Sequence, residues 1–132
     1  MSEIDFEEKV REIRAHDPRY ARNAYFFAFQ GLEYTMREHL KLSEDERRHV
    51  SANEILEGMR LLAVDQCGFM ARQVWESWGI FATGDWGNVI YNLIEADLMK
   101  QNEEDDIGDF KGVYTFEEVF DKPWSFIDKS NN

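Results

Sequence analysis

The sequence predicts a mainly α, compact helical domain with a central three-helix unit and a small C-terminal β-hairpin. Apolar residues recur every three or four positions over most of the chain, which is the spacing of one helix face. Capping residues and glycines divide this pattern into separate helices. We divide the single domain 1–132 into an N-terminal helix (1–17), a long aromatic helix (18–42), the three-helix unit (48–99), an acidic turn with the hairpin (100–120) and a tail (121–132).

Composition narrows the class of protein. With 43% hydrophobic and 14% aromatic residues, a chain of 132 residues can bury one core without metal or disulfides. Cys67 is the only cysteine, which excludes an intramolecular disulfide. Because 27 Asp and Glu oppose 15 Lys and Arg, the net charge of −12 repels nucleic acid and anionic membranes. Without a secretory signal or an apolar run of about 20 residues, we expect a cytoplasmic protein with no membrane partner.

Two helices are predicted before the central unit. Phe6, Val10 and Ile13 form the apolar stripe of a helix over 4–15. The pair Asp17-Pro18 then predicts a second helix that starts at Pro18, since Asp caps free N–H groups and Pro fits the first helical position.

The second helix is apolar on several faces, which favours a central position. Its aromatic run 24–29 would also fit a buried strand, but the surrounding Arg, Glu and Ala residues favour a helix. Gly31 within it predicts close approach of a neighbouring backbone.

The three-helix unit opens with the strongest local signal of the chain. Ser51 and Glu54 have the spacing of a capping box, and Val50 and Ile55 have that of a hydrophobic staple. Gly68 then stands where a left-handed residue ends the helix.

The other two helices of the unit are shorter. One is predicted over 69–78, ended by Gly79, with core positions Met70, Val74, Trp75 and Trp78. The last begins with Thr83 or Asp85 as its cap. Its apolar stripe consists of Trp86, Val89, Ile90, Leu93 and Ile94.

After this unit the composition becomes acidic. Residues 98–100 and 111–115 flank the acidic turn and are predicted to pair as a hairpin. Residues 116–120 fit one helical turn. We expect the aromatic tail 123–127 to pack back on the domain, with contact to a partner as the alternative.

Three helices followed by a hairpin have the outline of a winged helix, whose third helix would enter the major groove of DNA. Here the exposed face of that helix carries acids and amides instead of Arg and Lys. The DNA-binding interpretation is therefore disfavoured.

No constellation of catalytic or metal-binding residues is predicted, and no cofactor. The acidic turn lacks the ligand spacing of an EF-hand, and Glu46 with His49 forms a single Glu-x-x-His pair where a di-iron bundle needs two. Cys67 lies at the end of a helix, where the dipole raises the pKa of a thiol, so we interpret it as a core residue.

Most polar residues at the ends of the three helices are explained as caps. Arg48, His49 and Asp85 lie next to these caps without being required by them. We hypothesise that these three residues line a cleft for a small anion or a peptide terminus.

The strings RHVSANE, WGIFATGDWG, NLIEADL and DFKGVYTFEE resemble a family of short bacterial proteins classed as conserved hypothetical. The resemblance runs from about Tyr20 to Phe120 and implies no activity, cofactor or site residue. The leading function hypothesis is a non-enzymatic protein-interaction or regulatory module with a protein partner. The alternatives are a small-ligand-binding protein or weak enzyme that uses Arg48, His49 and Asp85, and a winged-helix nucleic-acid binder.

Overall fold

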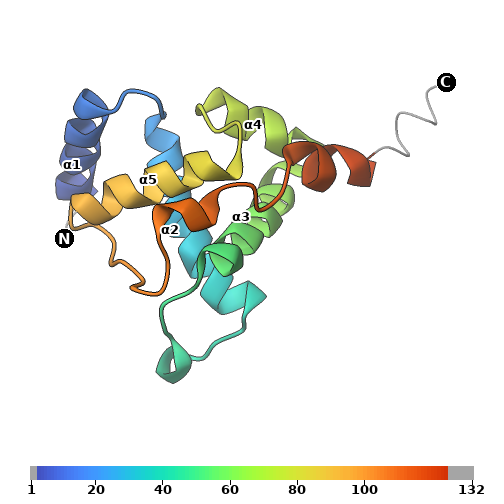
Figure 1. Cartoon of the computed structure of the whole chain (residues 1–132), viewed down its shortest axis with the longest axis horizontal. Coiled ribbons are helices and arrows are strands. Elements are labelled where there is room, and N and C mark those ends of the chain that lie inside the picture. Colours follow the sequence, from blue (N-terminus) through green and yellow to red (C-terminus); the bar gives the residue numbers. More distant parts are fainter. Residues whose placement is uncertain (1–2, 125–132) are drawn as a thin grey trace.

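The computed structural model describes residues 3–124, which form five α-helices joined by short turns (Figure 1). The α-helices are α1 (Glu3–His16), α2 (Arg22–Tyr34), α3 (Ala52–Cys67), α4 (Ala71–Ser77) and α5 (Thr83–Glu95). The shorter elements are π-helical turns at Thr35–His39 and Glu117–Asp121, and 3-10 turns at Glu44–Glu46, Gly68–Met70, Ile107–Phe110 and Lys122–Trp124. The predicted mainly helical class is confirmed.

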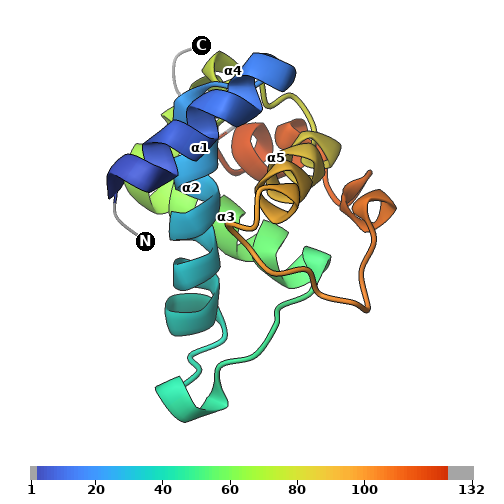
Figure 2. The same cartoon turned by 90° about the vertical axis from the view of Figure 1, so that its left-hand side faces the viewer.

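One cluster of buried residues draws on all five helices. Its centre is Trp75 of α4, whose ring meets Trp86 at 5.1 Å and Phe120 at 5.0 Å between ring centroids. Helix α1 packs on the outer side of α2 through Phe6, and Figure 2 shows it lying obliquely across α2. Aromatic pairs at such distances add about 0.5–1.5 kcal/mol each beyond their buried area.

Helices α2 and α3 cross closely because a glycine of each helix leaves room for a larger side chain from the other side of the crossing. A Cβ atom on Gly58 would overlap the side chain of Thr35, a buried residue whose hydroxyl donates to the Gly31 carbonyl at 2.6 Å. At Gly31, where close approach was predicted, a Cβ would lie 2.5 Å from Cγ of Met59. The neighbour there is a side chain, not a backbone.

The second helix begins later than predicted. Residues 18–21 form a turn, and Ala21 is the N-cap of α2. Asp17 does not cap a helix because its carboxylate pairs with the Arg19 guanidinium at 2.8 Å and accepts from Asn92 at 3.0 Å. Helical structure over 24–29 is confirmed, which excludes the strand interpretation.

The start and end of α3 match the prediction. Ser51 Oγ accepts the Glu54 N–H at 3.1 Å, and the Glu54 carboxylate accepts the Ser51 N–H at 2.9 Å. Val50 and Ile55, the predicted staple, are both buried. Gly68 follows with a φ of +55°, a left-handed value that suits glycine.

The prediction that Met70 lies in the core is wrong. The chain leaves α3 through the 3-10 turn Gly68–Met70, and Met70 is 44% exposed whereas Trp75 is fully buried. A 3-10 turn rotates further per residue than an α-helix, so the apolar positions before α4 do not continue its buried face.

The predicted C-terminal hairpin is wrong, because residues 3–124 contain no strand. Residues 107–110 form a 3-10 turn capped by Asp106, whose carboxylate accepts the Gly108 N–H at 2.8 Å. The Val113 N–H donates to Thr83 Oγ1 at 3.2 Å instead of to a second strand. The winged-helix outline fails with the hairpin, since the described part of the chain has no wing.

The helical turn predicted at 116–120 is confirmed as the π-helical turn Glu117–Asp121. Of the aromatic tail 123–127, residues 125–127 lie outside the described residues. Within 3–124, every helix is too short or too polar to cross a membrane.

Candidate functional site

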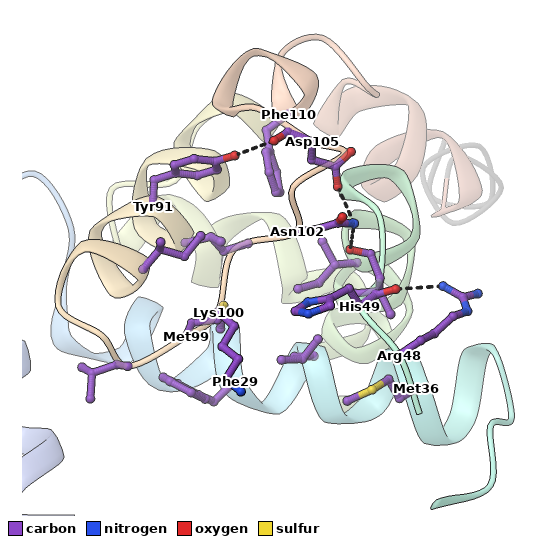
Figure 3. A pocket seen from close by; sticks show the side chains of 16 residues that line it. Phe29, Met36, Arg48, His49, Tyr91, Met99, Lys100, Asn102, Asp105 and Phe110 are labelled. Atoms are coloured by element: carbon purple, nitrogen blue, oxygen red, sulfur yellow. Dashed lines mark hydrogen bonds between the residues drawn. The ribbon is translucent and has the colours of Figure 1, made fainter. Parts of the chain in front are cut away.

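A cavity of about 320 Å³ opens between α2, the start of α3, α5 and the segment 98–110 (Figure 3). Its apolar wall consists of Phe29, Leu32, Met36, Val50, Ile55, Ile90, Ile94, Leu98, Met99 and Phe110. Its polar lining consists of Arg48, His49, Tyr91, Lys100, Asn102 and Asp105.

Segment 98–110 completes the cavity because polar side chains attach it to the start of α3. Asn102 Nδ2 donates to the Val50 carbonyl at 3.1 Å, and the Asp105 carboxylate accepts the Ala52 N–H at 2.9 Å. The first turn of a helix leaves N–H groups without partners, and Asp105 satisfies one of them. The acidic segment is therefore held across the end of α3.

Asp105 is the carboxylate of the cavity lining, and its side chain is held in place. Burial raises the pKa of its carboxyl group, an effect that the hydrogen bond from Ala52 opposes. The Tyr91 hydroxyl donates to the Asp105 carbonyl at 3.2 Å, and burial raises the pKa of that phenol. Both residues thus serve to hold the segment.

Arg48 and His49 lie at the mouth of this cavity. The half-exposed Arg48 guanidinium donates to both Glu54 carboxylate oxygens at 3.0 Å and to the His49 carbonyl at 3.0 Å. Its hydrogen bonds are the largest cause that lowers the pKa of Glu54 to about 2. Arg48 therefore reinforces the capping box of α3, while Figure 3 shows the His49 imidazole facing the cavity.

Lys100 is a second cation at the mouth. It is exposed, and Figure 3 shows its side chain extending from the 98–110 segment toward α2. Among the described residues, the side chains of Lys100 and His49 have no hydrogen-bond or ion-pair partner. They are the polar lining groups that the fold leaves uncommitted.

Asp85 lies outside the cavity lining. Its carboxylate accepts the Tyr20 hydroxyl at 2.7 Å and the N–H groups of Phe81 and Ala82 at 2.9 and 3.1 Å. It therefore reaches back to the start of α5 from the third helical position, whereas Ala82 is the N-cap, so neither Thr83 nor Asp85 occupies the predicted cap position. Burial is the main cause that raises the pKa of Tyr20 to about 12. The structure brings Arg48 and His49 together and leaves Asp85 elsewhere.

Sequence reasoning missed Tyr91, Lys100, Asn102 and Asp105 as lining residues. Asn and Asp in an acidic, turn-rich stretch are a signal for side-chain-to-backbone hydrogen bonds. That signal does not say which distant backbone groups they reach, and here the partners are about fifty residues away.

The residues that line the cavity include no Ser, Thr or Cys that His49 could activate as a nucleophile. No group of three or more metal-ligating side chains occurs within the described part of the chain. Comparisons with protein-family models, with curated proteins and with solved structures find no match for this chain.

Proposed function

We propose that the protein is a non-enzymatic binding module that holds a small, largely apolar ligand in the cavity between α2, α5 and segment 98–110. The cavity itself is the observation that carries this proposal. A concave site with an apolar wall and a few polar groups on one side is typical of small-molecule sites.

The volume sets the size of the ligand. A water molecule occupies about 30 Å³ in the liquid, so a cavity of about 320 Å³ has room for about ten non-hydrogen atoms. At ~0.5 kcal/mol per atom, such a ligand would bind with a Kd of about 0.2 mM. Octanoate and 1-octanol are probes of this size.

The other hypotheses lack a comparable feature. A protein partner is favoured by composition alone. Binding to nucleic acid would need arginines that are free to contact phosphates. Most of the described arginines are instead paired with carboxylates: Arg19, Arg22, Arg37, Arg47, Arg48, Arg60 and Arg72. Paired arginines and a net charge of −12 disfavour binding to a polyanion.

The test fills the cavity. Met99 is half-buried and lines the cavity, so Met99→Trp places an indole where the ligand would lie. Leu61 is half-buried on α3 outside the cavity, and Leu61→Trp is the matched control. Each protein is titrated with octanoate and with 1-octanol, and amide shifts are followed by two-dimensional NMR.

We expect at least one probe to shift amides around the cavity, including that of Ile94, in the parent and in Leu61→Trp. In Met99→Trp these shifts should be absent. The proposal is wrong if neither probe moves cavity amides at millimolar concentration, or if the filled variant binds as the parent does.

A further inference from the structure

The charged groups at the mouth of the cavity indicate the chemical class of the ligand, in addition to its size and polarity. We propose that the ligand is an amphiphilic carboxylate whose apolar body lies against the wall and whose anionic head group meets Lys100 and His49. This inference rests on the proposed function, and it adds the chemical class of the ligand.

The first step concerns which charges are available. Of the ionisable side chains that line the cavity, Arg48 is engaged by Glu54 and Asp105 is engaged by the N–H of Ala52. Lys100 and His49 have no partner among the described residues. The uncommitted groups are thus a cation and an imidazole that can donate a hydrogen bond.

The second step concerns the sign of the charge. Arg48 is already paired with Glu54, so Lys100 is the cation of the lining that has no counter-ion among the described residues, and the lining itself contains one carboxylate. That carboxylate, Asp105, also accepts from Asn102 at 3.2 Å and caps the start of α3, so it is a poor counter-ion for an amine. An anionic head group would neutralise the positive charge of Lys100, whereas an ammonium head group would be repelled by it.

The third step concerns orientation. Arg48, His49 and Lys100 are exposed, whereas the wall of the cavity is formed by buried and half-buried apolar side chains. A ligand therefore places its apolar body inside and its head group at the mouth, where the head remains partly hydrated. A singly charged carboxylate matches one free lysine and one imidazole donor.

The experiment compares four probes with one alkyl chain: octanoate, 1-octanol, octylammonium and octyl phosphate. Binding to the parent, Lys100→Gln and Lys111→Gln is measured by NMR titration at low and high salt. Lys111 is an exposed lysine outside the cavity lining, so its substitution makes the same change of net charge. His49→Leu, which removes the ring N–H donor, tests the second head-group contact.

We expect Lys100→Gln to weaken octanoate about two- to fivefold, the range for a partly exposed ion pair, and to leave 1-octanol unchanged. Lys111→Gln should change neither, and the effect of Lys100→Gln should shrink at high salt. Octanoate should bind the parent more tightly than octylammonium and octyl phosphate do. His49→Leu should weaken the binding of octanoate.

The inference is overturned if 1-octanol binds in the cavity and Lys100→Gln weakens octanoate no more than Lys111→Gln does. Tighter binding of octylammonium or octyl phosphate than of octanoate also overturns it. In these cases a ligand still enters the cavity, so the proposed function stands. If no probe enters the cavity, the proposed function itself fails.

Discussion

Asp85 connects the start of α5 to the turn before α2, and its replacement should be among the most destabilising polar substitutions in the protein. The carboxylate accepts from Tyr20, Phe81 and Ala82. Tyr20 is 1% exposed, and its hydroxyl also accepts from Asn88 at 2.8 Å. Asp85→Ala therefore removes the acceptor of these N–H groups at the start of α5 and leaves a buried hydroxyl without its acceptor.

The magnitude follows from the environment of each hydrogen bond. The Phe81 and Ala82 N–H groups lie near the surface, where water can replace the carboxylate, so losing these hydrogen bonds costs about 1 kcal/mol. The hydrogen bond from the buried Tyr20 hydroxyl to a charged acceptor is worth about 2 kcal/mol. The free energy of unfolding should fall by about 3 kcal/mol, which lowers Tm by about 11 °C for a chain of 132 residues.

A double-mutant cycle with Tyr20→Phe separates the two parts. Thermal and urea unfolding, followed by circular dichroism, should give a coupling free energy of about 1–2 kcal/mol between Asp85 and Tyr20. Asp65→Ala is the control, because Asp65 is an exposed acid on α3 and its loss should change stability by less than about 0.5 kcal/mol. If Asp85→Ala costs no more than Asp65→Ala, Asp85 does not hold α5 to the turn before α2.

Two further substitutions test the crossing of α2 with α3 and the start of α3. Gly58→Ala should lower the free energy of unfolding by about 2 kcal/mol because the new Cβ overlaps Thr35. Gly84→Ala should be neutral or stabilising, because its Cβ would make only an ordinary van der Waals contact with Lys111. Equal urea midpoints for the two variants would contradict the close crossing. Glu54→Gln should lower the free energy of unfolding at pH 7, and this loss should disappear as the pH falls from about 5 toward 2, because the folded-state pKa of Glu54 is depressed to about 2. A difference from the parent that is constant with pH would contradict the role of the Arg48–Glu54 pair.

The parts of the fold that could be predicted from the sequence are those determined by interactions between residues close together in the chain. The capping box of α3 joins Ser51 to Glu54, three residues apart, and is recognised from spacing alone. The start of α2 was predicted wrongly because Asp17 has a competing partner in Asn92, which lies 75 residues away. No local pattern contains that contact.

The same distinction explains the candidate site. Arg48 and His49 were predicted because they precede a recognisable helix start without being needed for the capping box. Residues 98–100 were predicted as one strand of a hairpin, with the acidic turn after them and residues 111–115 as the second strand, since turn-forming residues between two short apolar stretches favour pairing. The real partners of segment 98–110 are the backbone groups of Val50 and Ala52, so neither its course nor the position of Lys100 could be predicted.

The contacts at the cavity separate the residues that maintain the fold from those available to a ligand. Asp105 and Asn102 hold segment 98–110 on the start of α3, and Arg48 holds Glu54, so replacing any of them changes both stability and the shape of the cavity. Lys100 and His49 make no such contact within the described residues. Loss of affinity without loss of stability is therefore the specific signature expected of these two residues, and it distinguishes contact with a ligand from distortion of the cavity.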